Sequence, residues 1–151
     1  MYTVLKFLHV LAAVAWVGGG LTLTILAEQV RAHGTPEEMT ALLGRFEWFG
    51  KRFFSPLAVV VLLMGLGMAG IGGLMAAPWV SLGFLGIFAS AGIGMGYLTP
   101  KGRQISALLE QHGPAHPEVV ALTSRMLTAS RIDLVILVAV VAVMVFKPGA
   151  V

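Results

Sequence analysis

The sequence predicts an all-α membrane protein, built as a four-transmembrane-helix bundle with amphipathic cytoplasmic linker helices. Three observations predict it: an excess of apolar residues, four long apolar stretches, and basic residues gathered in two of the connections. Of the 151 residues, 58% are hydrophobic and only 11% are charged. A soluble domain carries about 25% charged residues, and a chain this short has too much surface to hide the apolar surplus. The composition therefore argues against a water-soluble enzyme.

Each of the four predicted spans is long enough to cross a bilayer, which takes about 20 mostly apolar residues. They lie at residues 4–27, 54–74, 79–99 and 129–147, and together they form a single membrane domain over residues 1–151. The fourth span reaches full length only if its helix includes Asp133. The apolar run of the first continues past the cleavage-like Ala13-Val14-Ala15, so we expect an uncleaved span.

The basic residues predict the orientation of these spans. Eight of the ten Lys and Arg residues lie in two long connections, residues 28–53 and 100–131. The positive-inside rule therefore places both connections in the cytoplasm and both termini outside. We expect the membrane itself to be a bacterial inner membrane. Because the basic residues form no block, we expect the lipid bilayer, and no nucleic acid, as a partner.

The connections themselves are expected to be helical. Thr35, Pro36 and Glu38 form a capping sequence with proline at the first helical position. Apolar residues then follow at helical spacing, which suits the membrane surface or a partner helix: Met39, Leu42, Leu43, Phe46 and Phe49. Residues 55–56 (Ser-Pro) restart or kink this helix at the second span. The order span, helical linker, span occurs twice, without a visible repeat of residues.

Glycines in the second span imitate a nucleotide-binding motif. Residues 65–70 match G-x-G-x-x-G, but they lie inside a span rather than between a strand and a helix. We interpret them as sites of close helix packing, because small residues let helices approach in lipid. Further pairs of small residues at four-residue spacing favour the same interpretation: Gly92 and Gly96, Ser90 and Gly94, Ala69 and Gly73.

The first span carries the strongest functional signal. Five of its residues recur at three- and four-residue steps and so share one helix face: Lys6, His9, Ala13, Trp16 and Gly20. An ionisable residue inside a span is costly and suggests a function. His9 could ligate a haem iron or copper, or relay a proton; alternatively, it is hydrogen-bonded to a neighbouring helix. Lys6 could equally extend to the lipid headgroups.

A second ligand for such a metal has few candidates, because the other histidines lie in the connections. Met68 is predicted at about the depth of His9, and thioether plus imidazole is a known haem ligation. Met68 could instead be packing, and a second His9 could come from a homodimer.

The run from Leu5 to His9, followed by Trp16-Val17-Gly18-Gly19, resembles the first span of a group of small bacterial membrane proteins. That group includes the copper-resistance D proteins, the HemJ-type protoporphyrinogen oxidases and a family of predicted membrane proteins of unknown function. The overall layout is most similar to the unknown-function family. It includes Arg131-x-Asp133 at the entry to the fourth span and the Lys147-Pro148-Gly149 ending.

The resemblance to the HemJ-type proteins, which bind haem b, implies that His9 is an axial haem ligand. It also implies that Lys6 lies near a propionate or an anionic substrate, and we expect Trp16 and Met68 to complete the site. The chain departs from that family after Gly19, where residues 20–26 replace the expected aromatic, proline and arginine signature. This departure counts against porphyrinogen oxidation but not against haem binding.

Asp133 is the other candidate for a buried charge. Its depth places it near Glu28, Ser55 and Tyr97. It could form a salt bridge that locks the helix ends, or deliver protons or contact a headgroup. The arginines available for a salt bridge are Arg31, Arg52 and Arg131.

Three functions remain open on these grounds. The first is a haem-b-binding or redox-linked membrane protein, with His9 as ligand. The second is a non-catalytic accessory subunit of a larger respiratory or photosynthetic complex. The third is copper handling, since methionine suits Cu(I).

The chain has no cysteine, which excludes thiolate and iron–sulfur chemistry. No Ser–His–Asp set supports hydrolysis, and whether the protein is an enzyme stays open.

Overall fold

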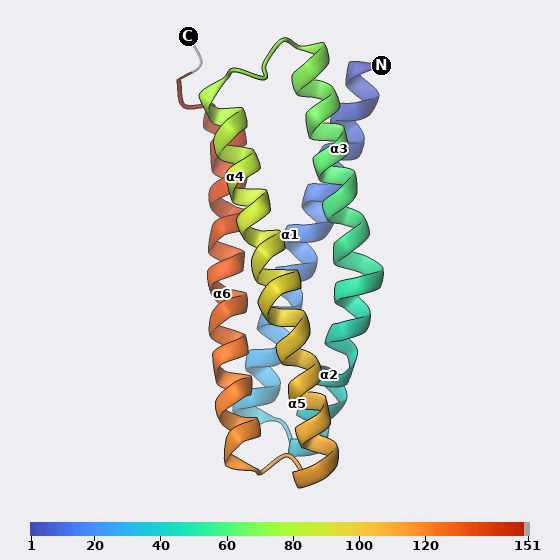
Figure 1. Cartoon of the computed structure of the whole chain (residues 1–151), viewed down its shortest axis with the longest axis vertical. Coiled ribbons are helices and arrows are strands. Elements are labelled where there is room, and N and C mark those ends of the chain that lie inside the picture. The colour runs from blue at the N-terminus through green and yellow to red at the C-terminus, as the bar shows by residue number, and fades with distance from the viewer. Residues whose placement is uncertain (150–151) are drawn as a thin grey trace.

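The computed structural model describes residues 1–149 and forms a bundle of four long helical rods (Figure 1). The first rod is α1 (Tyr2–His33) and the last is α6 (Pro117–Phe146). The second joins α2 (Pro36–Phe49), the π-helical turn η1 (Gly50–Phe54) and α3 (Ser55–Ile71), and the third joins α4 (Pro78–Ile93), the π-helical turn η2 (Gly94–Leu98) and α5 (Thr99–His112). All four rods are long and apolar enough to cross a membrane, which confirms the predicted fold class.

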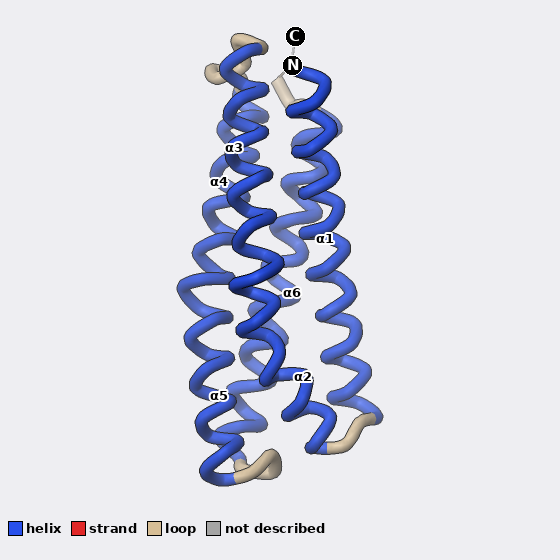
Figure 2. The backbone as a smooth tube through the Cα atoms, turned by 90° about the vertical axis from the view of Figure 1, so that its right-hand side faces the viewer, coloured by secondary structure: helices blue, strands red, loops and turns tan. Residues whose placement is uncertain are grey.

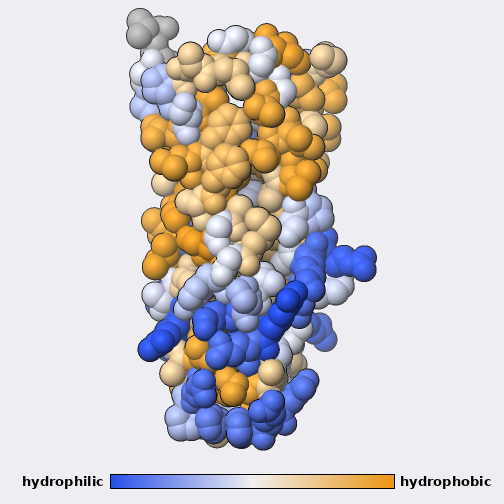
Figure 3. All heavy atoms as spheres, in the orientation of Figure 1, coloured by the Kyte–Doolittle hydropathy of each residue, from blue (hydrophilic) through white to orange (hydrophobic). Residues whose placement is uncertain are grey.

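The rods are longer than a bilayer is thick. The 32 residues of α1 span about 48 Å at 1.5 Å per residue, against a hydrocarbon core of about 30 Å. Apolar side chains cover the upper part of the molecule, where the N-terminus lies, and polar side chains gather toward the lower part (Figure 3). We call these the terminal end and the basic end. The apolar surface is the part suited to lipid contact.

The predicted linker helices are extensions of the spans rather than separate surface helices. Figure 2 shows α2 continuing into α3, and α4 into α5, along the axis of the bundle. The cap at Thr35 is confirmed. The Thr35 hydroxyl accepts a hydrogen bond from the Glu38 backbone N–H, and the Glu38 carboxylate accepts one from the Thr35 backbone N–H. The apolar face of α2 packs on partner helices in a basic-end cluster: Leu43, Ile105, Leu109, Val119, Leu122 and Met126.

The two π-helical turns reveal a repeat of residues that the sequence analysis missed. Ser55 Oγ donates to the Gly50 carbonyl at 2.8 Å, and Thr99 Oγ1 donates to the Gly94 carbonyl at 2.9 Å. A proline follows each hydroxyl residue, and proline has no backbone N–H to continue an α-helical ladder. The spacing G-x-x-x-x-[S/T]-P thus occurs once on the second rod and once on the third, and these two rods run in opposite directions.

Glycines do mediate close packing between the spans, but partly at positions other than those predicted. Gly65 and Gly67 face His9 and Leu5 of α1, as the packing interpretation of this motif expects. Between α4 and α6, a Cβ at Gly86 would overlap the side chain of Val140.

The glycines of the other predicted small-residue pairs do not lie at close helix contacts, although Ser90 and Ala69 of these pairs are buried. Added Cβ atoms at Gly92, Gly94 and Gly96 would meet nothing within 4 Å, and neither would those at Gly70 and Gly73. The spacing predicts that such residues share a helix face, but which face meets a neighbour depends on the rotation of the helix. In α4, the face that meets α6 is the one that carries Gly83 and Gly86.

Candidate functional site

His9 lies half-buried between α1 and α3, with its ring oriented by the α3 backbone. Its Nδ1 is 2.9 Å from the carbonyl oxygen of Val61. A carbonyl only accepts, so Nδ1 carries the hydrogen and, in the neutral ring, Nε2 keeps a free lone pair. Gly65 admits the ring, since a Cβ there would lie 3.1 Å from His9 Cε1. The predicted alternative, a hydrogen bond to a neighbouring helix, is confirmed.

The other residues predicted around His9 do not join it. Lys6 is exposed, and Trp16 is buried two turns deeper, in a mid-bundle cluster with Val61 and Leu137. His9 lies level with Val61 and Gly65, so Met68 is nearer the terminal end than the depth estimate placed it. That estimate counted from the span ends, whereas the packing of α1 against α3 sets the actual register. Trp16 and Met68 therefore lie at other levels of the bundle than His9, whereas Lys6 is one helical turn from His9 on α1.

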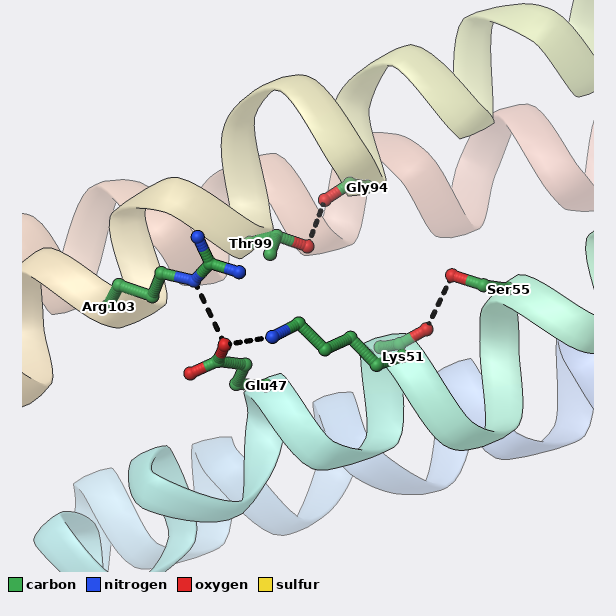
Figure 4. A network of polar contacts seen from close by, with 7 residues as sticks. Glu47, Lys51, Ser55, Gly94, Thr99 and Arg103 are labelled. Atoms are coloured by element: carbon green, nitrogen blue, oxygen red, sulfur yellow. Dashed lines mark hydrogen bonds and ion pairs between the residues drawn. The ribbon is translucent and has the colours of Figure 1, made fainter.

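A cavity of about 360 Å³ opens at a different level, between the mid-bundle cluster and the basic-end cluster. All four rods line it, and most of the lining is apolar. Trp16 belongs to this lining, whereas His9, Lys6 and Met68 do not. Both π-helical turns line the cavity, and so do Ser55 and Thr99, the residues that follow them on the second and third rods (Figure 4).

Most of the polar lining residues have a hydrogen-bond partner on their own helix. Besides Ser55 and Thr99, Thr24 donates to the Gly20 carbonyl and Ser130 to the Met126 carbonyl. Two lining residues differ. The Ser90 hydroxyl and the Asp133 oxygen Oδ1 are buried and have no hydrogen-bond partner among residues 1–149.

Asp133 does not form the predicted salt bridge. Arg31 and Arg131 both pair with Glu28 on α1, and Asp133 makes no ion pair within the described part of the chain. The reason is the geometry of α6. Residues two apart point to different sides of a helix, so Arg131 reaches outward to Glu28 while Asp133 lines the cavity. Of its predicted neighbours, Ser55 shares the cavity with Asp133.

Glu47 is the second acidic residue of the lining, and its charge is already matched. Its Oε1 accepts from Lys51 one turn later, and from Arg103 Nε at 2.9 Å (Figure 4). This carboxylate thereby ties α2 to α5 beside the two π-helical turns. The order of residues along the chain indicated Asp133 as a functional candidate, but not Glu47, Ser90 or Thr99. The repeated G-x-x-x-x-[S/T]-P spacing was the signal that would have found Thr99.

In residues 1–149, no three His, Asp or Glu side chains come together in a group that could hold a metal ion. A metal at His9 would therefore depend on other kinds of ligand. The donor that the structure does offer there is the Nε2 lone pair of an oriented ring.

A family model with the description "Predicted integral membrane protein (DUF2269)" matches residues 3–148. No curated protein and no solved structure matches the chain. The match covers all four rods, the cavity and His9.

Proposed function

The chain belongs to the DUF2269 family of predicted integral membrane proteins, and we propose that it binds a small, largely apolar molecule within the membrane. The observation that carries this proposal is the cavity of about 360 Å³ between the four rods. Binding sites for small molecules have volumes of about 300–1,000 Å³ and apolar walls with a few placed polar groups. The cavity has both properties.

The rim of the cavity supports entry from the bilayer. Val59 on α3, and Phe88 and Met95 on the third rod, line the cavity and are also more than half exposed. These side chains lie on the apolar surface that suits lipid contact. A molecule dissolved in the membrane would therefore reach the cavity without passing through water.

Binding can be tested by filling the cavity. Trp16 reports on the lining by fluorescence once Trp48→Phe and Trp79→Phe remove the other two tryptophans. We expect 4-phenylbutanol to change the Trp16 emission of the protein in lipid nanodiscs. Ala91→Leu adds bulk to the lining and should weaken this binding about tenfold or more, a loss of about 1.4 kcal/mol.

Ala139→Leu is the matched control, because Ala139 is exposed on α6 and does not line the cavity. It should bind 4-phenylbutanol as the parent does. Equal binding of 4-phenylbutanol by the parent and the Ala91→Leu variant would overturn the proposal. So would a parent protein that binds neither this alcohol nor its amine analogue.

A second candidate function is haem-b binding, favoured by the hydrogen bond from His9 Nδ1 to the Val61 carbonyl. Metal-ligating histidines commonly donate their other N–H to a carbonyl in this way. His9 would hold the iron through Nε2, while Val61 and Gly65 orient the ring and the exposed Lys6 pairs with a propionate. The haem would supply one-electron chemistry.

An absorption spectrum of the purified protein, oxidised and reduced with dithionite, tests this candidate. We expect a Soret band that shifts on reduction, is lost in His9→Ala and persists in the control His33→Ala, a histidine exposed at the basic end. A flat visible spectrum, from cells supplied with haem, would exclude haem as the ligand.

A further inference from the structure

We propose that the molecule bound in the cavity carries a positively charged amine, which pairs with the carboxylate of Asp133. This inference rests on the proposed binding function and adds the chemical class of the ligand. It goes beyond the sequence analysis, which treated Asp133 as a salt-bridge partner, a proton carrier or a headgroup contact.

The charges of the lining favour a cation. Among the described residues that line the cavity, Glu47 and Asp133 are the only charged ones, and none is Lys, Arg or His. Glu47 is matched by Lys51 and Arg103. Asp133 is left without a counter-charge, so the cavity is complementary to a ligand with one positive charge.

The unpartnered atoms show where the amine would bind. A buried oxygen without a hydrogen bond costs free energy. Asp133 Oδ1 and Ser90 Oγ make no hydrogen bond of good geometry in residues 1–149, although the two side chains are near each other. An ammonium group donates up to three hydrogen bonds, and those to a carboxylate are about twice as strong as neutral ones. One ammonium group could therefore donate to both oxygens.

The remaining walls suit the rest of a lipophilic amine. Aromatic rings of Trp16, Phe54 and Phe88 line the cavity from three different elements. Aromatic faces attract ammonium groups, and they also pack against apolar tails. A free inorganic cation has no apolar part to pack against these walls, so the lining favours an organic amine.

A matched pair of probes tests the inference. 4-Phenylbutylammonium and 4-phenylbutanol have similar shapes and differ in charge, and their binding is compared by Trp16 fluorescence in lipid nanodiscs. We expect the amine to bind the parent about tenfold more tightly, because a hydrogen bond to a charged group contributes about 1.5–3 kcal/mol. Asp133→Asn should remove this preference and leave alcohol binding within about twofold of the parent. Glu118→Gln, which removes an exposed acidic residue of the same helix, should preserve it.

The outcomes separate this inference from the binding function. If neither probe binds the parent, the proposed function itself fails. If both probes bind the parent equally, or if Asp133→Asn keeps the preference for the amine, the cavity binds apolar molecules but the amine inference is overturned. Because the comparison on the parent decides by itself, the test stands even if Asp133→Asn does not fold.

Discussion

At the scale of single residues, His9 and Asp133 are polar groups inside an apolar bundle that differ in their hydrogen bonding. His9 donates to the Val61 carbonyl across the α1–α3 contact, so its Nδ1 already has a hydrogen-bond partner. Asp133 Oδ1 has no partner in the described chain. A buried polar atom without a partner is unfavourable for stability, and each such atom in a native structure calls for an explanation.

The tautomer of His9 is a direct prediction of this geometry. We expect the neutral ring to carry its hydrogen on Nδ1, because only that tautomer donates to Val61 O. The ¹⁵N chemical shifts of the imidazole, measured in nanodiscs above pH 7.5, check this; His33, which is exposed, provides the reference for a free ring. A His9 spectrum that shows the hydrogen on Nε2 would contradict the hydrogen bond.

At the scale of helices, small residues decide which faces meet. α4 and α6 pack where Gly83 and Gly86 receive side chains of α6, and α1 and α3 pack where Gly65 and Gly67 face α1. Gly92, Gly94 and Gly96 satisfy the same spacing rule, but an added Cβ at each of them would meet nothing within 4 Å. In lipid, helices associate mainly through close packing and interhelical hydrogen bonds, so an added methyl group at a true contact should weaken the bundle.

Gly86→Ala tests this contact. A Cβ at Gly86 would overlap Val140, whose branched side chain is stiff, and we expect a loss of about 1–3 kcal/mol in the free energy of unfolding. Unfolding in mixed micelles with a denaturing detergent measures the change.

Gly92→Ala is the control for Gly86→Ala, because its added methyl group would meet nothing within 4 Å. It should be neutral or stabilising by about 0.5–1 kcal/mol, since alanine is the better helix former. Adding Val140→Ala to Gly86→Ala should recover part of the loss. Equal stability of the two glycine variants would contradict the assigned α4–α6 contact.

At the scale of the whole molecule, the bundle divides along its axis. The terminal end presents apolar side chains suited to lipid (Figure 3). The basic end carries the ion pairs of Glu28 and Glu47 and its own apolar cluster. The cavity lies between the mid-bundle cluster and this basic-end cluster. Both π-helical turns, with their hydroxyl and glycine pairs, also line it.

The orientation of this axis is a prediction that the native chain makes easy to test, because it contains no cysteine. Single cysteines at Met75 and Ala115 lie at opposite ends of the bundle, and both positions are exposed. In intact cells, we expect a membrane-impermeant maleimide to label Met75→Cys and to leave Ala115→Cys unlabelled until the cells are opened. The reverse pattern would invert the predicted topology.

The order of residues along the chain was enough to predict four membrane-spanning helices and the cap at Thr35, and to identify His9 and Asp133 as ionisable residues inside the spans. Each depends on the composition or spacing of one segment, since a span needs only enough consecutive apolar residues. The tertiary structure decided three other features: the level of Met68 in the bundle, the ion-pair partner of Arg131, and the cavity that brings Ser90, Glu47 and Asp133 together. Those features depend on the register and rotation of each helix against the others, which are set by contacts between residues far apart in the chain.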